Sequence, residues 1–189
     1  MTVRAVLLTH GAGSDRDHPT LTALEDGLAP LPVHRMNFPY REQGRRAPDR
    51  APKLIAAIRD EVGEVCERLG IEPDDVVLGG RSMGGRMCSM AVAEGLPAAG
   101  LVLLSYPLHP PGKPDRLRTD HFPQLGVPCL FIAGDRDPFG TPDEVTHHIA
   151  SIPGSTELHW LPGRHDVKGQ DERILELVAG WISSLDPAG

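Results

Sequence analysis

The sequence predicts an α/β domain, a three-layer α/β/α sandwich in which helices cover both faces of a mostly parallel sheet. Six short apolar, β-branched runs alternate with longer helical patterns along the 189 residues, and such alternation is typical of parallel sheets. The runs at Val76–Leu78 and Leu101–Leu104 are apolar at consecutive positions, as expected of strands covered on both sides. The length fits one domain, so residues 1–189 are expected to fold as a unit.

The expected strands are the six apolar runs. They are Val3–Thr9, Val33–Phe38, Asp75–Gly80, Gly100–Ser105, Pro128–Ala133 and Thr156–Leu161. The expected helices show apolar residues at spacings of three and four. They are Thr20–Leu28, Pro52–Leu69, Met83–Glu94, Pro142–Ile152 and Asp171–Leu185. The segment Gly112–Gln124 is expected to be short or irregular.

Composition narrows the class of protein. Apolar residues make up 40% and charged residues 24% of the chain, which is ordinary for a globular domain. The net charge of −7 argues against a nucleic-acid partner or an anionic membrane surface, since either would need a basic face. No apolar run reaches membrane-spanning length. We therefore expect neither kind of partner, and an acidic balance is normal for a cytoplasmic enzyme.

The N-terminus and the cysteines indicate a cytoplasmic location. The run from Met1 to His10 carries one positive charge and ends in His-Gly, which favours a first strand over a signal peptide. Cys66, Cys88 and Cys129 are odd in number and widely spaced, as expected of core residues in a reducing compartment. They provide neither a disulfide framework nor zinc-ligand spacing.

The most informative stretch runs from Val76 to Arg86. An apolar strand ends in two glycines, Ser82 lies between Gly80 and Gly84, and a helical pattern follows at once. This is the G-x-S-x-G nucleophile elbow, in which a sharp strand-to-helix turn lifts the serine hydroxyl above the sheet. Glycine-rich strand-to-helix turns also occur in parallel α/β proteins without catalysis, so the pentapeptide needs an acid and a histidine to support it.

Both partners follow Ser82 in the chain, in the order Ser, Asp, His that accompanies such an elbow. A serine hydroxyl needs an imidazole to accept its proton and a carboxylate to orient that imidazole. His165 lies in the loop after the sixth strand, whereas His147, His148 and His159 fall in a helix or a strand.

The acid lies in the loop after the fifth strand, which holds both Asp135 and Asp137. We favour Asp137, which lies in the turn just before Pro138. Asp135 is nearer the strand end and is suited to capping the turn. The choice between the two stays open at this stage.

The loop after the first strand, His10–Ser14, is rich in glycine. Backbone amides of Ala12 and Met83 are expected to hold the oxyanion that forms during acyl transfer, with His10 supporting the loop. A dinucleotide-binding loop is less favoured, because Arg16 occupies the position of the third glycine. No Walker or metal-hydrolase motif is present, so neither a cofactor nor a metal is expected.

Neighbouring loops are expected to supply substrate contacts. The expected contacts are Gly11, Tyr40, Tyr106 and Leu108.

With these motifs located, the chain resembles the α/β-hydrolase superfamily over essentially its whole length. More narrowly it is similar to the small, lidless dienelactone-hydrolase-like branch that includes the testis-expressed hydrolase-like proteins. That match rests on three runs, Gly80–Arg86, Tyr106–Gly112 and Gly134–Gly140. The resemblance implies a minimal α/β-hydrolase fold without a cap domain, beginning at what is usually the third strand. It also implies the triad and oxyanion residues named above.

These observations favour a serine hydrolase that cleaves small carboxylic esters or thioesters through an acyl-enzyme. An alternative is a non-catalytic hydrolase-like binding or scaffold module, since fold and motif do not guarantee turnover. A peptidase is less favoured, because such enzymes usually add a large gating domain. Acyl and leaving groups, the pathway and the oligomeric state are not predicted.

Overall fold

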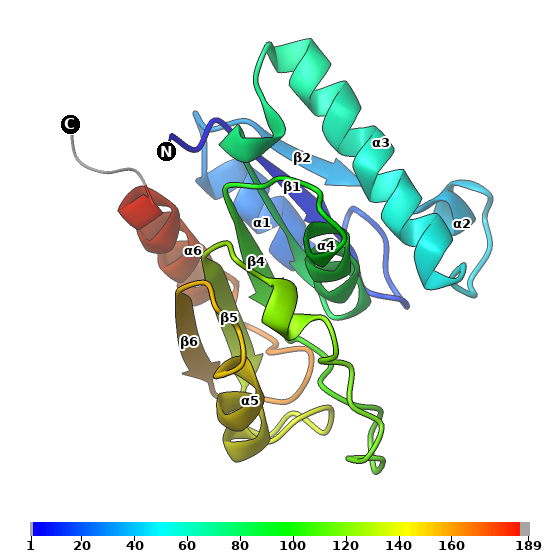
Figure 1. The fold of residues 1–189 in the computed structure, drawn as a ribbon, viewed down its shortest axis with the longest axis vertical. Helices are drawn as coiled ribbons and strands as arrows, with labels where there is room; N and C mark the ends of the chain where they lie inside the picture. The colour runs from blue at the N-terminus through cyan, green and yellow to red at the C-terminus, as the bar shows by residue number, and fades with distance from the viewer. Residues whose placement is uncertain (1, 186–189) are drawn as a thin grey trace.

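Six strands form one parallel sheet in the computed structural model, which describes residues 2–185 (Figure 1). The strands are β1 (Ala5–Thr9), β2 (Val33–Met36), β3 (Val76–Arg81), β4 (Gly100–Leu104), β5 (Cys129–Gly134) and β6 (Thr156–Leu161). Their order across the sheet is β2-β1-β3-β4-β5-β6, and each neighbouring pair is parallel. Every loop that follows a strand therefore emerges at the same edge of the sheet, where ligands bind in such folds.

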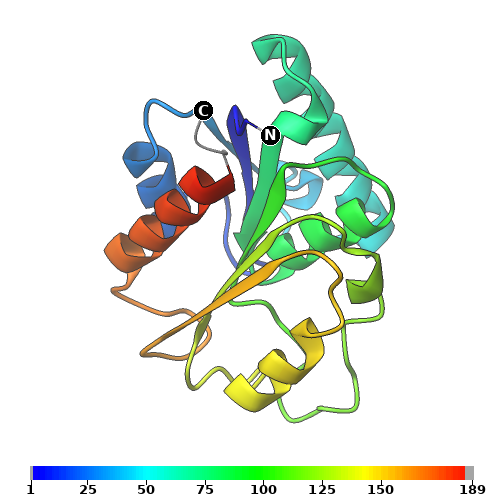
Figure 2. The same cartoon turned by 60° about the vertical axis from the view of Figure 1, so that its left-hand side comes forward.

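Helices cover both faces of this sheet, as Figure 2 shows. On one face lie α1 (Pro19–Gly27) and α6 (Asp171–Leu185), and their apolar residues pack on the sheet in one core cluster. On the other face lie α3 (Ala51–Leu69), α4 (Met83–Ala93) and α5 (Pro142–Ile149). Short segments complete the chain: α2 (Pro39–Glu42) and the 3-10 turns η1 (Pro73–Asp75) and η2 (Phe122–Gln124).

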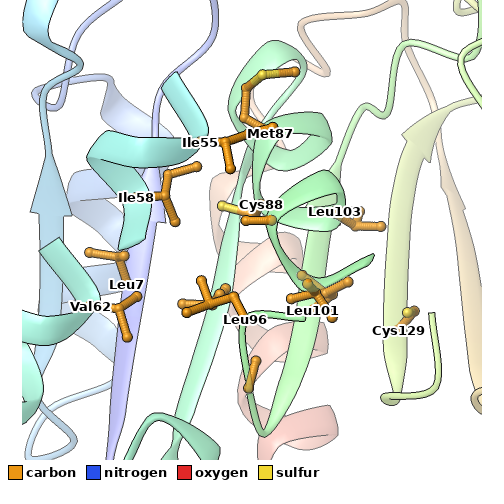
Figure 3. Close-up of a cluster of buried hydrophobic side chains, with 14 of the residues drawn as sticks. Leu7, Ile55, Ile58, Val62, Met87, Cys88, Leu96, Leu101, Leu103 and Cys129 are labelled. Carbon is orange, nitrogen blue, oxygen red and sulfur yellow. The ribbon is translucent and has the colours of Figure 1, made fainter. Parts of the chain in front are cut away.

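The larger core cluster lies between the sheet and the helices α3 and α4. Ile55, Ile58 and Val62 of α3 point toward Leu7 of β1 and toward α4 (Figure 3). The three cysteines are buried and free, as predicted, and burial raises the pKa of Cys88 and that of Cys129 to about 12. They therefore act as small apolar residues of the core.

The predicted fold class is confirmed, and all six strands and five helices are found. One difference concerns the end of β2, which stops at Met36 rather than Phe38. The Phe38 amide donates to the His10 ring instead of continuing the strand, with a distance of 3.2 Å from N to Nε2. The short helix α2 then begins at Pro39, in a segment that the sequence analysis treated as a loop.

The loop between β4 and β5 has no regular structure over most of its length, yet its ends are anchored. His121 Nε2 lies 2.8 Å from Ser89 Oγ of α4, and the Tyr106 hydroxyl donates to the Arg118 carbonyl oxygen at 2.6 Å. The Tyr106 ring packs against Phe122 and Phe131. The loop is therefore tied both to α4 and to itself.

This anchoring predicts a pH dependence of stability. Burial and the nearby Arg86 lower the pKa of His121 to about 4, from 6.5. Between these values the unfolded chain binds a proton at this site that the folded chain does not, so the free energy of unfolding should decrease as the pH falls from 6.5 to 4. His121→Gln should make this decrease smaller in urea unfolding measured at pH 7, 5.5 and 4.5. An unchanged pH dependence would contradict the assignment.

Candidate active site

Ser82 lies at the turn between β3 and α4 with an unusual backbone conformation. Its φ is +49° and its ψ is −114°, a region that residues with a Cβ atom rarely adopt and that costs about 1–3 kcal/mol. The surrounding sheet holds it there, since the Ser82 amide donates to the Leu104 carbonyl oxygen of β4 at 2.8 Å. The side chain makes no capping bond to α4, which leaves the hydroxyl available at the sheet edge.

Two glycines allow the turn to form beneath β1. A Cβ atom on Gly80 would collide with the side chain and backbone oxygen of Thr9, and one on Gly84 would lie 2.6 Å from the His10 carbonyl oxygen. A Cβ atom on the neighbouring Gly85 would be similarly crowded, at 2.7 Å from the Gly80 carbonyl oxygen. The G-x-S-x-G pattern is therefore a packing requirement of this crossing.

The predicted residues Ser82, His165 and Asp137 form a continuous chain of contacts. Ser82 Oγ lies 2.8 Å from His165 Nε2, and His165 Nδ1 lies 2.7 Å from Asp137 Oδ2. The Asp137 side chain is 2% exposed and that of His165 is 23% exposed. A carboxylate in this position fixes the ring with Nδ1 protonated and Nε2 free to accept the Ser82 proton.

The structure distinguishes Asp137 from Asp135. Asp137 faces His165 with one oxygen, while its other oxygen accepts from the Phe139 amide at 2.9 Å. Asp135 is exposed and accepts from the Gly163 amide at 2.9 Å, a bond that lowers the pKa of Asp135. Asp135 thus ties the β5 loop to the β6 loop, in keeping with the turn-capping role considered for it.

Phe139 is a residue of this site that the sequence analysis did not select. Its ring stacks on the His165 imidazole with centroids 4.1 Å apart and planes 29° apart. The contact restrains one face of the ring, whereas the two hydrogen bonds restrain its edge. Phe139 lies two residues after Asp137 in a turn, and no pattern in the sequence indicates which way a turn residue points.

The loop Gly11–Ser14 is supported from below by two side chains. His10 is fully buried, donates from Nδ1 to the Gly11 carbonyl oxygen at 2.8 Å and accepts from the Phe38 amide at Nε2. Burial lowers the pKa of His10, so the ring is neutral, as this bonding pattern requires. The Tyr40 hydroxyl donates to the Ala12 carbonyl oxygen at 3.0 Å, and the two contacts hold the loop beside Ser82.

The amides of Ala12 and Met83 have no hydrogen-bond acceptor within residues 2–185. Met83 is the first residue of α4, where helix geometry leaves amides unpaired and the positive end of the helix dipole points outward. Both residues line one cavity together with Ser82. Two unpaired donors beside a serine hydroxyl could bind the oxyanion that forms when such a hydroxyl attacks a carbonyl group.

Two cavities meet at Ser82 and share Ala12 and Phe139. The first, here called the His165 cavity, has a volume of about 310 Å³ and is also lined by Gly11, Gly13, Ser14, His18, Arg81 and His165. The second, here called the Arg86 cavity, has a volume of about 250 Å³ and is also lined by Met83, Arg86, Pro107 and Arg118. Of the predicted substrate contacts, Gly11 lines a cavity wall.

Tyr40, Tyr106 and Leu108 lie elsewhere than the sequence analysis expected. Their exposed fractions are 0%, 5% and 1%, and none lines either cavity. The rings of Tyr40 and Tyr106 pack into the core, and each hydroxyl donates to a loop carbonyl oxygen. Leu108 packs against Gly140 at the start of the α5 segment. Burying these apolar surfaces outweighs exposing them at a rim, so all three support the loops from behind.

Arg81 is a buried cation at the base of the His165 cavity. One of its amino groups lies 2.6 Å from His18 Nε2, and the other donates to the His165 carbonyl oxygen at 3.2 Å. Burial lowers the pKa of Arg81, and burial together with Arg81 lowers that of His18. Arg81 therefore anchors the backbone of His165 to the end of β3.

Within residues 2–185 no cluster of His, Cys, Asp or Glu side chains could hold a metal ion.

A family model described as an alpha/beta hydrolase domain matches residues 2–178. The chain belongs to this family. The predicted membership of the α/β-hydrolase superfamily is thereby confirmed, and residues 2–185 form a small domain without a lid. None of the helices in residues 2–185 has the length and apolar character needed to cross a membrane.

Solved structures of other α/β-hydrolases share the fold at low sequence identity. A dienelactone hydrolase from Anabaena variabilis has a TM-score of 0.74 and 20% identity, over 97% of this chain and 87% of its own. A thermophilic esterase from Thermogutta terrifontis has a TM-score of 0.71 and 20% identity, over 98% and 92%. The RedJ thioesterase from Streptomyces coelicolor has a TM-score of 0.69 and 19% identity, over 93% and 84%.

The backbone at Ser82 leads to a stability prediction for this α/β-hydrolase. Ser82→Gly should relieve the strain of the positive φ, offset in part by the greater freedom of glycine in the unfolded chain, for a net gain of roughly 1 kcal/mol. Ser82→Ala keeps the Cβ atom and should show no such gain. Urea unfolding of the two variants measures the difference, and equal stabilities would argue against strain at this turn.

Proposed function

We propose that this α/β-hydrolase cleaves carboxylic esters or thioesters of modest size through an acyl-enzyme on Ser82. The observation that carries the proposal is the unbroken chain from Asp137 through His165 to Ser82, with contacts of 2.7 and 2.8 Å. A half-buried serine hydroxyl at a turn has no structural need for an imidazole backed by a buried carboxylate. The same arrangement is what nucleophilic catalysis requires.

In the first half of the reaction, Ser82 Oγ attacks the acyl carbon while His165 Nε2 takes the hydroxyl proton. The carbonyl oxygen becomes negatively charged and receives hydrogen bonds from the amides of Ala12 and Met83, which have no other acceptor within residues 2–185. Asp137 stabilises the imidazolium without taking its proton. No cofactor takes part in these steps.

His165 then returns the proton to the leaving alcohol or thiol, and the acyl group stays on Ser82. Water enters where the leaving group was, gives a proton to His165 and releases the acid. Since the proton must reach the leaving atom, that atom lies on the side of Ser82 where His165 forms the wall. The leaving group therefore occupies the His165 cavity, and the acyl group occupies the Arg86 cavity.

Family membership supports hydrolysis, and the names of the structural neighbours support the choice of bond, since they include an esterase, a dienelactone hydrolase and a thioesterase. Cavities of about 250 and 310 Å³ favour small substrates. The three cysteines are free and buried, which fits a cytoplasmic location. A non-catalytic binding module stays the alternative, and it predicts no acylation of Ser82.

The test is covalent labelling with a fluorophosphonate probe, followed by mass spectrometry of the intact protein. One adduct on Ser82 is expected in the parent protein and none in Ser82→Ala. His165→Ala should label far more slowly, because no imidazole takes the proton. A folded parent protein that forms no adduct would favour the binding module.

The two aspartates of the β5 loop offer a matched pair for kinetics. Asp137→Asn should lower kcat for a short-chain ester by roughly 10³- to 10⁴-fold, because the amide no longer holds the correct His165 tautomer. Asp135→Asn makes the same chemical change two residues away and should lower kcat far less. A larger loss in Asp135→Asn than in Asp137→Asn would reverse their assignment.

A further inference from the structure

Two arginines line the acyl side of the site although the proposed reaction gives neither a role. Arg86 projects from the first turns of α4, and Arg118 lies in the loop between β4 and β5. Both line the Arg86 cavity beside Ser82 and Met83. They come from segments 32 residues apart in sequence, so the tertiary fold brings the two guanidinium groups to one cavity wall.

Neither guanidinium is neutralised by the protein. Within residues 2–185, Arg86 and Arg118 form no salt bridge, whereas Arg35, Arg45 and Arg173 each do. The Nε atom of Arg86 is buried and has no hydrogen-bond partner within those residues. The Arg86 guanidinium also lies near the Tyr106 hydroxyl and near His121, and both of these groups are uncharged at neutral pH, since burial raises the pKa of Tyr106 and burial together with Arg86 lowers that of His121 to about 4. A buried donor without an acceptor is costly and needs an explanation.

The surroundings make this pair of cations less favourable still. Burial and the charge of Arg86 both lower the pKa of Arg118, which means that the two groups are close enough to repel each other. The first turn of α4 contains no acidic residue, and a cation there also faces the positive end of the helix dipole. One anion in the cavity would relieve all three costs: the unpaired Arg86 donor, the repulsion between the two arginines and the unfavourable helix dipole.

The anion is not expected to come from the leaving group. That side of the site is the His165 cavity, which is lined by a single arginine, Arg81. Both amino groups of Arg81 have partners, His18 and the His165 carbonyl oxygen, although its Nε has none, whereas the acyl side brings two guanidinium groups together. The Arg86 cavity receives the acyl group under the proposed function, on which the present inference rests. An anion bound by Arg86 and Arg118 is therefore part of the acyl group itself.

We propose that the acyl group carries a carboxylate at its far end, so that the substrates are monoesters or monothioesters of short dicarboxylic acids. Guanidinium groups match a carboxylate in geometry and charge. A cavity of about 250 Å³ has room for a short acyl chain with one terminal carboxylate. The net charge of −7 would repel anions in general, so the selectivity is local to this cavity wall.

The proposal is tested with 4-nitrophenyl hydrogen adipate and its neutral counterpart, 4-nitrophenyl methyl adipate, at pH 7.5 after subtraction of spontaneous hydrolysis. The two esters share the reacting bond and the leaving group and differ in the charge at the far end of the acyl chain. The parent protein should show a kcat/KM at least about tenfold higher for the charged ester. A neutral ester that reacts as fast or faster would overturn the proposal.

Arg118→Gln should lower the ratio of the two kcat/KM values by roughly ten- to hundredfold, the worth of a hydrogen bond to a charged group, mainly through KM of the charged ester. Its backbone bonds to Leu108 and Tyr106 do not involve the side chain, so folding should be kept. Arg116→Gln is the matched control: it removes one positive charge from the same loop at an exposed position outside both cavities, and should leave the ratio unchanged. Equal losses for both esters in Arg118→Gln would assign Arg118 to the oxyanion or to the fold and overturn the carboxylate site.

A binding measurement separates this inference from the proposed function. Monomethyl adipate should bind Ser82→Ala in calorimetric titration, and Arg118→Gln in that background should weaken binding by at least tenfold. Added salt should weaken it too, through screening. If no ester is turned over but this binding occurs, the catalytic proposal fails and the anion site stands. If esters are turned over without any such binding or charge preference, the anion site fails and the catalytic proposal stands.

Discussion

The candidate site depends on one close crossing of the backbone, where β3 turns into α4 beneath the end of β1. Side chains at positions 80 and 84 would collide with Thr9 and His10, and the Ser82 amide is fixed by the Leu104 carbonyl oxygen on the other side. The β1-β3-β4 order of the sheet supplies both neighbours. Ser82 is thus held in a costly conformation by contacts on two flanks, which is how strained residues persist in folded proteins.

The same sheet order brings the other parts of the site to that crossing. The loop after β1 lies beside Ser82 on one side, and the loops after β5 and β6 deliver Asp137 and His165 on the other. Each loop is short or internally tied: His10 and Tyr40 hold the first, and Asp135 joins the last two. These ties hold the loops in fixed positions around Ser82, and preorganised donors are the most effective in stabilising charge.

Charge is distributed unevenly around this edge of the sheet. The chain as a whole is acidic, yet three arginines, Arg81, Arg86 and Arg118, line the two cavities. The acid of the site, Asp137, is buried behind the ring of His165. Under the proposed function, the negative charge that develops on the carbonyl oxygen of the substrate would lie near unpaired amides and cations, while the Asp137 carboxylate would stabilise the His165 imidazolium. This separation suits acyl transfer, in which both charges form in one step.

The sequence by itself determined the features that follow from local rules. Apolar periodicity identified all six strands and five of the six α-helices in residues 2–185, and the parallel sheet followed from their alternation. The elbow could be recognised because its glycines are required by a backbone turn that spans only five residues. Asp137 and His165 could be recognised because they follow strands that end at the same edge of the sheet. Only the tertiary structure decided where side chains in irregular segments point. Tyr40, Tyr106 and Leu108 turned into the core, Phe139 stacked on His165, and Arg86 met Arg118 across 32 residues. The orientation of these side chains depends on burial and charge contributed by segments distant in the sequence. Periodicity along the chain contains no information about such contacts.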